Sequence, residues 1–126
     1  ITFLSDLDPD CTVFIDPSHL KQILWNLLKN AAQAISDTGR VTIRLKNAGN
    51  GRVYLVISDT GQGIEPDQRR HIFDPFYTTK PEGTGLGLSI IHRLIDSYNG
   101  LIDFESTPGK GTVFTILFRS PETVSG

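Results

Sequence analysis

An amphipathic helix in the first third of the chain limits its possible folds more than any other segment. Its apolar residues recur at spacings of three and four: Leu20, Ile23, Leu24, Leu27, Leu28, Ala31 and Ile35. This spacing predicts a helix with one apolar face. Asp16-Pro17 marks its start, because Asp caps helices and Pro suits the first helical position, and Asp37-Thr38-Gly39 is typical of an exit turn. Because one face of the helix has to be buried, a second layer must cover it.

Short strands supply that second layer. The strand-like runs are Ile1–Leu4, Thr12–Ile15, Val41–Leu45, Val53–Ile57, Leu101–Ser106 and Thr112–Arg119, and two more helical stretches are Asp67–Ile72 and Leu86–Tyr98. This order predicts an α/β two-layer sandwich, with a mixed sheet of about five strands and three helices on one face. We expect a single domain over residues 1–126, with residues 119–126 as a frayed tail.

Composition narrows the possible partners. The formal net charge of −2 provides no positive field, which argues against binding to nucleic acid or to an anionic membrane surface. Cys11 is the only cysteine, so no internal disulfide and no cysteine-based zinc site can form, and a cytoplasmic setting is expected. No apolar run approaches the roughly 20 residues of a membrane helix, so we expect no direct membrane contact from this domain.

A long irregular connection follows the predicted strand Val53–Ile57, and such connections often carry function. It opens with Asp59-Thr60-Gly61-Gln62-Gly63-Ile64, which places a carboxylate at a strand end and two glycines beside it. This Asp could accept a hydrogen bond from the amino group of adenine. An Asp that only initiates a turn fits the same residues.

Two further features suit an anionic ligand. A polar stripe on the first helix comprises Gln22, Asn26 and Asn30, four residues apart, with Lys29 and Gln33 beside them. A plain solvent-facing surface is the alternative for this stripe. Gly83-Thr84-Gly85-Leu86-Gly87-Leu88 runs into the last helix, where free N–H groups could meet phosphate. The turn has neither the Lys-Ser/Thr ending of the P-loop nor the spacing of the dinucleotide-binding fingerprint, so neither family fits.

In chain order the motifs are an Asn-striped helix, Asp-x-Gly-x-Gly after a strand, Phe73-Asp74-Pro75-Phe76, and Gly-x-Gly-x-Gly before a helix. This order resembles the N box, first glycine box, F box and second glycine box of sensor histidine kinases, from about Asp16 to Phe118. These kinases share the Bergerat ATP-binding fold with gyrase B subunits, mismatch-repair ATPases and heat-shock chaperone ATPases. The residues from Ile72 to Lys80 are similar to the nitrogen-regulatory branch of sensor kinases in particular.

The resemblance implies a phosphate end and a base end for an ATP site. At the phosphate end, Asn30 would coordinate Mg²⁺, and Asn26, Lys29 and Lys80 would act on the phosphates. Thr84 and the backbone amides of Gly85, Leu86 and Gly87 would bind the phosphate chain. At the base end, the residues implied are Asp59 to read adenine, Gly61 and Gly63 to shape the pocket, Ile64 to line it, and Thr112 to bind adenine through ordered water. The stretch from about Asp74 to Thr84 would be a mobile lid, anchored by Phe73 and Phe76.

The chain departs from the family pattern at three positions of the first helix. Gln33 and Ala34 stand where many relatives carry a Lys and an aromatic residue, so one phosphate contact and one stacking contact are missing. Gln22 stands where hydrolytic relatives carry a glutamate base, which favours a kinase over an ATPase because an amide cannot take a proton from water. None of His19, His71 and His92 is followed by an acidic residue, so we expect none of them to be the phosphoacceptor.

The implied function is binding of Mg·ATP and transfer of its γ-phosphoryl group to a histidine on a separate dimerisation and phosphoacceptor domain, within a two-component signalling system. A response-regulator receiver domain would then take the phosphoryl group. We expect the fragment to be a monomer and the full kinase, which could be anchored in a membrane, to be a homodimer. The alternatives are an anti-sigma-factor-type serine kinase and a nucleotide-sensing module that transfers nothing.

Overall fold

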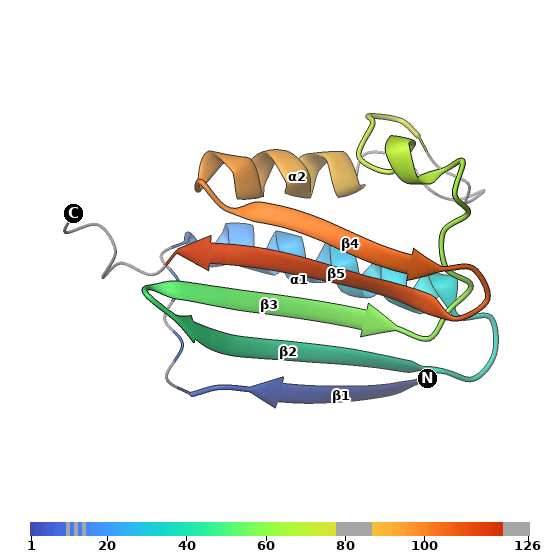
Figure 1. Ribbon diagram of the computed structural model, residues 1–126, viewed down its shortest axis with the longest axis horizontal. Coiled ribbons are helices and arrows are strands. Elements are labelled where there is room, and N and C mark those ends of the chain that lie inside the picture. Colours follow the sequence, from blue (N-terminus) through green and yellow to red (C-terminus); the bar gives the residue numbers. More distant parts are fainter. Residues whose placement is uncertain (10, 12, 14, 78–86, 120–126) are drawn as a thin grey trace.

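The computed structural model describes residues 1–9, 11, 13, 15–77 and 87–119. The elements in chain order are β1 (Thr2–Leu7), α1 (Pro17–Ala34), β2 (Arg40–Gly49), β3 (Arg52–Asp59), a 3₁₀ turn η1 (Arg69–His71), α2 (Gly87–Ser97), β4 (Leu101–Thr107) and β5 (Gly111–Arg119). Five strands form one sheet in the order β1-β2-β3-β5-β4. The two α-helices lie together on one face of this sheet (Figure 1). The predicted two-layer α/β sandwich is therefore confirmed.

The sheet is mixed because one of its connections is a crossover. β1 pairs with β2 in parallel, and α1 is the segment that joins them, as parallel neighbours require. The other three pairings are antiparallel. The β4–β5 hairpin pairs with β3 through β5, so the last strand of the chain lies inside the sheet. The end of β3 and the turn of the β4–β5 hairpin therefore lie at one end of the sheet (Figure 1).

Helix α1 begins and faces the sheet as its sequence predicts. The Asp16 side chain caps the helix by accepting a hydrogen bond from the Ser18 backbone N–H at 2.9 Å, and Pro17 is the first helical residue. Ile23, Leu27 and Ala31 are buried in its apolar face. The helix ends one residue before Ile35, which turns to an extended conformation.

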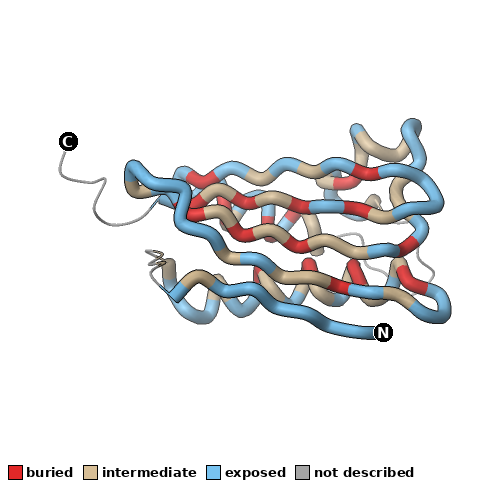
Figure 2. The backbone as a smooth tube through the Cα atoms, turned by 60° about the horizontal axis from the view of Figure 1, so that its bottom comes forward, coloured by how far each residue is buried: buried red, intermediate tan, exposed pale blue. Residues whose placement is uncertain are grey.

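The core lies between the helices and the inner face of the sheet. Its largest fully buried side chains are Ile23, Leu27, Ile57, Ile91, Ile95, Ile116, Val41 and Val53. Each such side chain stabilises the fold by about 1.5–3 kcal/mol relative to exposure. Figure 2 shows the buried stretches in the central strands and the helices, whereas β1 is exposed throughout. The end of β3 and the start of β5 are thus held in place by this core.

Two expectations about secondary structure were wrong. The stretch expected to be a third helix is only the 3₁₀ turn Arg69–His71, so the described residues contain two α-helices. A single 3₁₀ turn fits because Pro66 and Pro75 bracket the segment and a proline interrupts helical hydrogen bonding. The described residues of the expected strand Thr12–Ile15 pair with no strand, because Val13 and Ile15 pack against the core instead.

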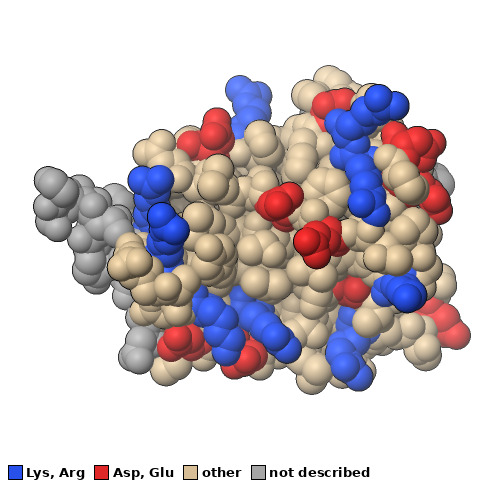
Figure 3. All heavy atoms as spheres, viewed as in Figure 1, with Lys and Arg blue, Asp and Glu red and all other residues tan. Residues whose placement is uncertain are grey.

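In the described part of the chain, neither α-helix covers the other face of the sheet. Figure 3 shows acidic and basic side chains interspersed on it, without one large area of a single sign. One ion pair, between Lys46 Nζ and Asp6 Oδ2 at 2.8 Å, ties β1 to β2. Across the described residues, neither α-helix combines the length and apolar character needed to cross a membrane.

Candidate functional site

The predicted base end is built around Asp59, the last residue of β3. Asp59 lies directly opposite Thr112 of β5, so both side chains project from the helix-covered face of the sheet. Its Oδ1 accepts a hydrogen bond from the Gly61 backbone N–H at 2.8 Å. The Asp59 carboxylate thus forms the turn that the sequence allowed, and its reading of adenine stays a prediction.

The loop after Asp59 is held against the end of α1. The Gln62 backbone N–H donates to the Ala34 carbonyl at 2.9 Å. A Cβ atom on Gly61 would lie 2.6 Å from the same carbonyl oxygen, which is closer than real Cβ atoms approach. Gly61 is thus required by a close approach between two backbone segments.

The same loop is held against the turn of the β4–β5 hairpin. The Gly109 backbone N–H donates to the Gln62 carbonyl at 2.7 Å. Gly63 has a φ of 76°, and a Cβ atom on it would lie 2.4 Å from the Thr107 carbonyl oxygen. The loop is therefore clamped between α1 and the hairpin, which fixes the wall of the pocket beside Asp59.

A buried serine that the motif analysis did not identify joins these pieces. The Ser106 hydroxyl oxygen lies 2.7 Å from the Ile64 backbone nitrogen, 2.9 Å from Thr112 Oγ1 and 3.1 Å from the Gly111 carbonyl oxygen. The Arg69 guanidinium in η1 donates to the Ser106 carbonyl. Ser106 could have been found as an inward-facing polar residue on the predicted strand Leu101–Ser106, but only the strand register places it opposite Thr112.

The predicted phosphate end lies where α1 meets the start of α2. A Cβ atom on Gly87 would be 3.3 Å from Asn26 Oδ1, so the first residue of α2 lies against this amide. Asn26 and Asn30 are half-buried, whereas Lys29 is exposed. The first turn of a helix presents backbone N–H groups without helical partners and the positive end of its dipole. A polar amide and a helix N-terminus therefore face the same region.

The polar stripe of α1 connects the predicted phosphate end with the predicted base end. Asn26 lies beside Gly87, and Ala34, two turns later, lies beside Gly61. Eight residues of helix span about 12 Å at 1.5 Å per residue. Asn30 lies midway between these contacts. The structure thus brings Asn26, Asn30, Gly87 and the Asp59 loop along one side of α1.

Some predicted site residues fall outside the described part of the chain. These are Lys80, Thr84, Gly85 and Leu86, together with most of the expected lid. Their roles stay predictions.

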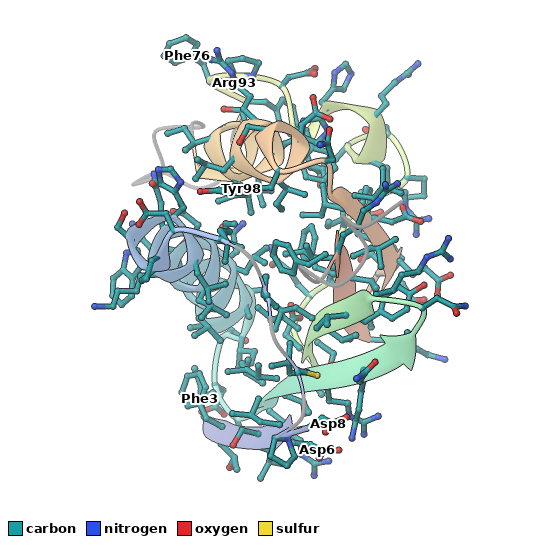
Figure 4. The ribbon with its side chains drawn as sticks, turned by 90° about the vertical axis from the view of Figure 1, so that its left-hand side faces the viewer. Phe3, Asp6, Asp8, Phe76, Arg93 and Tyr98 are labelled. Atoms are coloured by element: carbon teal, nitrogen blue, oxygen red, sulfur yellow. The ribbon has the colours of Figure 1, made fainter. Side chains whose placement is uncertain are left out.

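The two phenylalanines of the F box behave differently. Phe73 is half-buried and packs on His92 and Phe104, with ring centroids 5.0 Å and 5.9 Å away, which is the predicted anchor. The prediction for Phe76 was wrong, because its side chain is 74% exposed. Its φ of 67° places the backbone in the left-handed region and turns the ring outward, as Figure 4 shows.

The described contacts of the three histidines are with other side chains of the domain. His19 Nδ1 lies 2.7 Å from the Tyr98 hydroxyl, and Figure 4 shows Tyr98, which directly follows α2, between that helix and α1. His71 Nδ1 lies 2.9 Å from Asp74 Oδ2, and the His92 ring packs on Phe73. These contacts give each histidine a packing role, and the expectation that none of them is the phosphoacceptor stays a prediction.

Comparison with known proteins identifies the family and the fold. Residues 15–122 match the family described as histidine kinase-, DNA gyrase B- and HSP90-like ATPases. Over 105 residues the chain is 43% identical to the sensor histidine kinase ZraS of Klebsiella oxytoca, which covers 83% of this chain and 23% of ZraS. The chain therefore spans about a quarter of the length of this relative.

Solved structures show the same fold. The mycobacterial sensor histidine kinase MprB superimposes with a TM-score of 0.84 at 32% identity, covering 94% of this chain and 80% of that one. Full-length ShkA, crystallised in complex with AMPPNP, superimposes with a TM-score of 0.82 at 32% identity, covering 94% of this chain and 26% of ShkA.

Proposed function

The chain belongs to the family of histidine kinase-, DNA gyrase B- and HSP90-like ATPases, and we propose that it binds Mg·ATP and presents the γ-phosphoryl group to a histidine on another domain. The observation that carries this proposal is the polar stripe of α1. It runs from the start of α2, beside Asn26, to the clamped Asp59 loop, beside Ala34. One extended nucleotide along this side of the helix would reach both ends.

Asp59 and its neighbours would hold the adenine base. The Asp59 carboxylate would accept a hydrogen bond from the amino group, Ile64 would contact the ring, and Thr112 would assist through ordered water. The loop is anchored on two sides by backbone hydrogen bonds, so its wall is formed before the nucleotide arrives. Gly61 and Gly63 keep that wall close to α1 and the hairpin.

Asn26 and the start of α2 would hold the phosphate chain. Backbone N–H groups at a helix N-terminus can bind anions. We propose that Gly87 belongs to this group, and that Thr84, Gly85 and Leu86 extend it, as the resemblance implies. Lys29 and Lys80 are the candidates for direct contact with the γ-phosphate.

The residues fit a Mg²⁺ ion that arrives with the nucleotide. Mg²⁺ prefers oxygen ligands and is often held by one or two protein oxygens together with substrate phosphates. The described residues contain no cluster of three or more His, Cys, Asp or Glu side chains suited to a metal. Asn30, midway along the stripe, would supply its amide oxygen to this ion. Mg²⁺ bound there would neutralise charge on the phosphate oxygens during transfer.

The acceptor histidine would come from a separate dimerisation domain. Relatives such as ZraS are several times longer than this chain, and they are named sensor histidine kinases. The AMPPNP complex of ShkA supports nucleotide binding in this family, since AMPPNP is an analogue of ATP. Gln22 supplies no general base for water, which favours transfer over hydrolysis. A receiver domain would accept the phosphoryl group next, in a homodimeric parent kinase; the nitrogen-regulatory subtype stays a prediction.

Incubation with γ-labelled ATP tests the proposed function. The chain is mixed with a dimerisation domain that carries the acceptor histidine, supplied as a separate polypeptide. We expect acid-labile label on that domain. Acid-stable label would indicate a serine kinase, and Mg·ATP binding without any transfer would indicate a nucleotide-sensing module.

A further inference from the structure

The Ser106 hydroxyl makes three contacts at hydrogen-bond distance in the interior of the domain. Its neighbours are the Ile64 N–H at 2.7 Å, Thr112 Oγ1 at 2.9 Å and the Gly111 carbonyl oxygen at 3.1 Å. Ser106 and Thr112 are only 8% and 4% exposed. Bulk water therefore does not replace these contacts, and each buried polar group needs a partner within the fold.

Only one placement of the hydroxyl protons makes hydrogen bonds of all three contacts. A serine hydroxyl donates one hydrogen bond and accepts two. The Ile64 N–H is a donor, so Ser106 accepts from it. The Gly111 carbonyl is an acceptor, so Ser106 donates its single proton there. The third contact is then a hydrogen bond only if the Thr112 hydroxyl donates to Ser106.

The opposite placement is unfavourable. If Ser106 donated to Thr112, its lone pairs would face the Gly111 carbonyl oxygen at 3.1 Å, and two acceptors would repel each other. The arrangement is also held in place from outside. Arg69 donates to the Ser106 carbonyl, and Gly111 and Thr112 are fixed in the hairpin register.

Thr112 consequently has no proton left for a ligand. Its oxygen offers lone pairs only, and it lies directly across the ladder from Asp59, whose carboxylate is also an acceptor. The base end of the site thus presents two acceptors side by side, where Figure 1 shows the end of β3 next to the hairpin turn.

We propose that Ser106 is a positioning residue that fixes Thr112 as a hydrogen-bond acceptor, and that the site thereby favours a purine with an amino group at C6 over one that carries only hydrogen there. The inference rests on the proposed nucleotide-binding function. An amino group donates to these acceptors, directly or through water, whereas a C6 hydrogen leaves them without a donor. A site built to pair with one group rejects the analogue that lacks it.

The test compares ADP with the 5′-diphosphate of purine riboside by titration calorimetry, because these two bases share the N1 lone pair and differ only in the C6 amino group. The parent should prefer ADP by about tenfold or more. In Ser106→Ala the Thr112 hydroxyl is free to rotate and no longer presents a fixed acceptor to the amino group, so this preference should fall by about tenfold. A purely structural role for Ser106 would weaken both nucleotides equally and leave the preference unchanged, which would overturn the inference.

Thr112→Val supplies the matched control. It removes the hydroxyl on which Ser106 acts, so adding Ser106→Ala to it should leave the ADP preference as it is in Thr112→Val alone. If Ser106→Ala lowered the ADP preference in the Thr112→Val background as much as it does in the parent, Ser106 would act by another route. A failed proposed function looks different, because the parent would then bind neither of the two nucleoside diphosphates. If Ser106→Ala did not fold, Thr112→Val alone would still have to lose the preference.

Discussion

The clamped loop after Asp59 leads to a quantitative prediction of the stability lost when Gly63 is replaced. Two glycines of the chain have nearly the same left-handed backbone, Gly63 with φ 76° and Gly49 with φ 78°. They differ in their surroundings. A Cβ atom on Gly63 would lie 2.4 Å from the Thr107 carbonyl oxygen, whereas a Cβ atom on Gly49 would meet nothing within 4 Å. The pair therefore separates backbone strain from a steric clash.

Both alanine variants should lower the free energy of unfolding, but by different amounts. The left-handed conformation costs an alanine about 1–2 kcal/mol, and this cost is common to both positions. Gly63→Ala adds the cost of overpacking against a backbone atom that cannot rotate away, about 1–3 kcal/mol. We expect Gly49→Ala to lose about 1–2 kcal/mol and Gly63→Ala about 2–5 kcal/mol, because strain and overpacking add.

Urea denaturation measures these losses, and calorimetry with ADP measures the site. Gly63→Ala displaces the loop from the hairpin, so its affinity for ADP should fall about tenfold or more, whereas Gly49→Ala should bind ADP as the parent does. Equal destabilisation by the two substitutions would refute the clamp. A large loss of stability at Gly63 with unchanged ADP affinity would separate the clamp from the proposed site.

Three further substitutions test the site and the fold. Asp59→Asn should weaken ADP binding by about tenfold to a hundredfold, because its amide can present NH₂ to the adenine amino group; unchanged affinity in calorimetry would leave Asp59 as a turn residue only. Asn30→Ala should reduce the thermal stabilisation by Mg·ATP and leave that by adenosine unchanged, whereas an Asn that merely faces water predicts equal Mg·ATP stabilisation in both proteins. Hydrogen bonds from the Ser18 hydroxyl and backbone N–H lower the pKa of Asp16, so this cap stabilises the fold above the ordinary aspartate pKa and loses its effect as pH falls through the folded-state pKa; the gap in Tm between parent and Asp16→Ala should close over that acidic range, and a constant gap would contradict the cap. The chain alone should accumulate no acid-labile label from γ-labelled ATP, and stable label would contradict the assignment of its histidines to packing roles.

Local patterns predicted much of the fold because they are set by neighbouring residues. The cap at Asp16 and the apolar spacing of α1 depend on residues within one or two turns, and both were predicted. The prediction of a third helix was wrong because the segment around Arg69 closes only short 3₁₀-type turns, and Arg69 is bound to Ser106, 37 residues away. Periodicity reports nothing about such a contact.

The site was predicted less completely because it depends on register. Asp59 and the glycines beside it were recognisable from their order in the chain. Ser106 was missed, since its role depends on the direct pairing of Ser106 with Thr112 and of Asp59 with Thr112. Phe76 was wrongly expected to anchor the lid, because hydrophobicity alone does not reveal a left-handed backbone that points the ring outward.

The position of β5 inside the sheet determines when, during synthesis, this domain can complete its fold. β3 pairs with β5, although the paired residues lie roughly 50 to 70 positions apart in the chain. During synthesis, β3 must therefore wait until β5 has left the ribosome, and closing so long a segment slows folding. Asp59 meets Thr112 in this same late pairing. A chain whose synthesis had not yet reached β5 would thus lack both the central pairing of the sheet and the Asp59–Thr112 pair of the proposed base pocket.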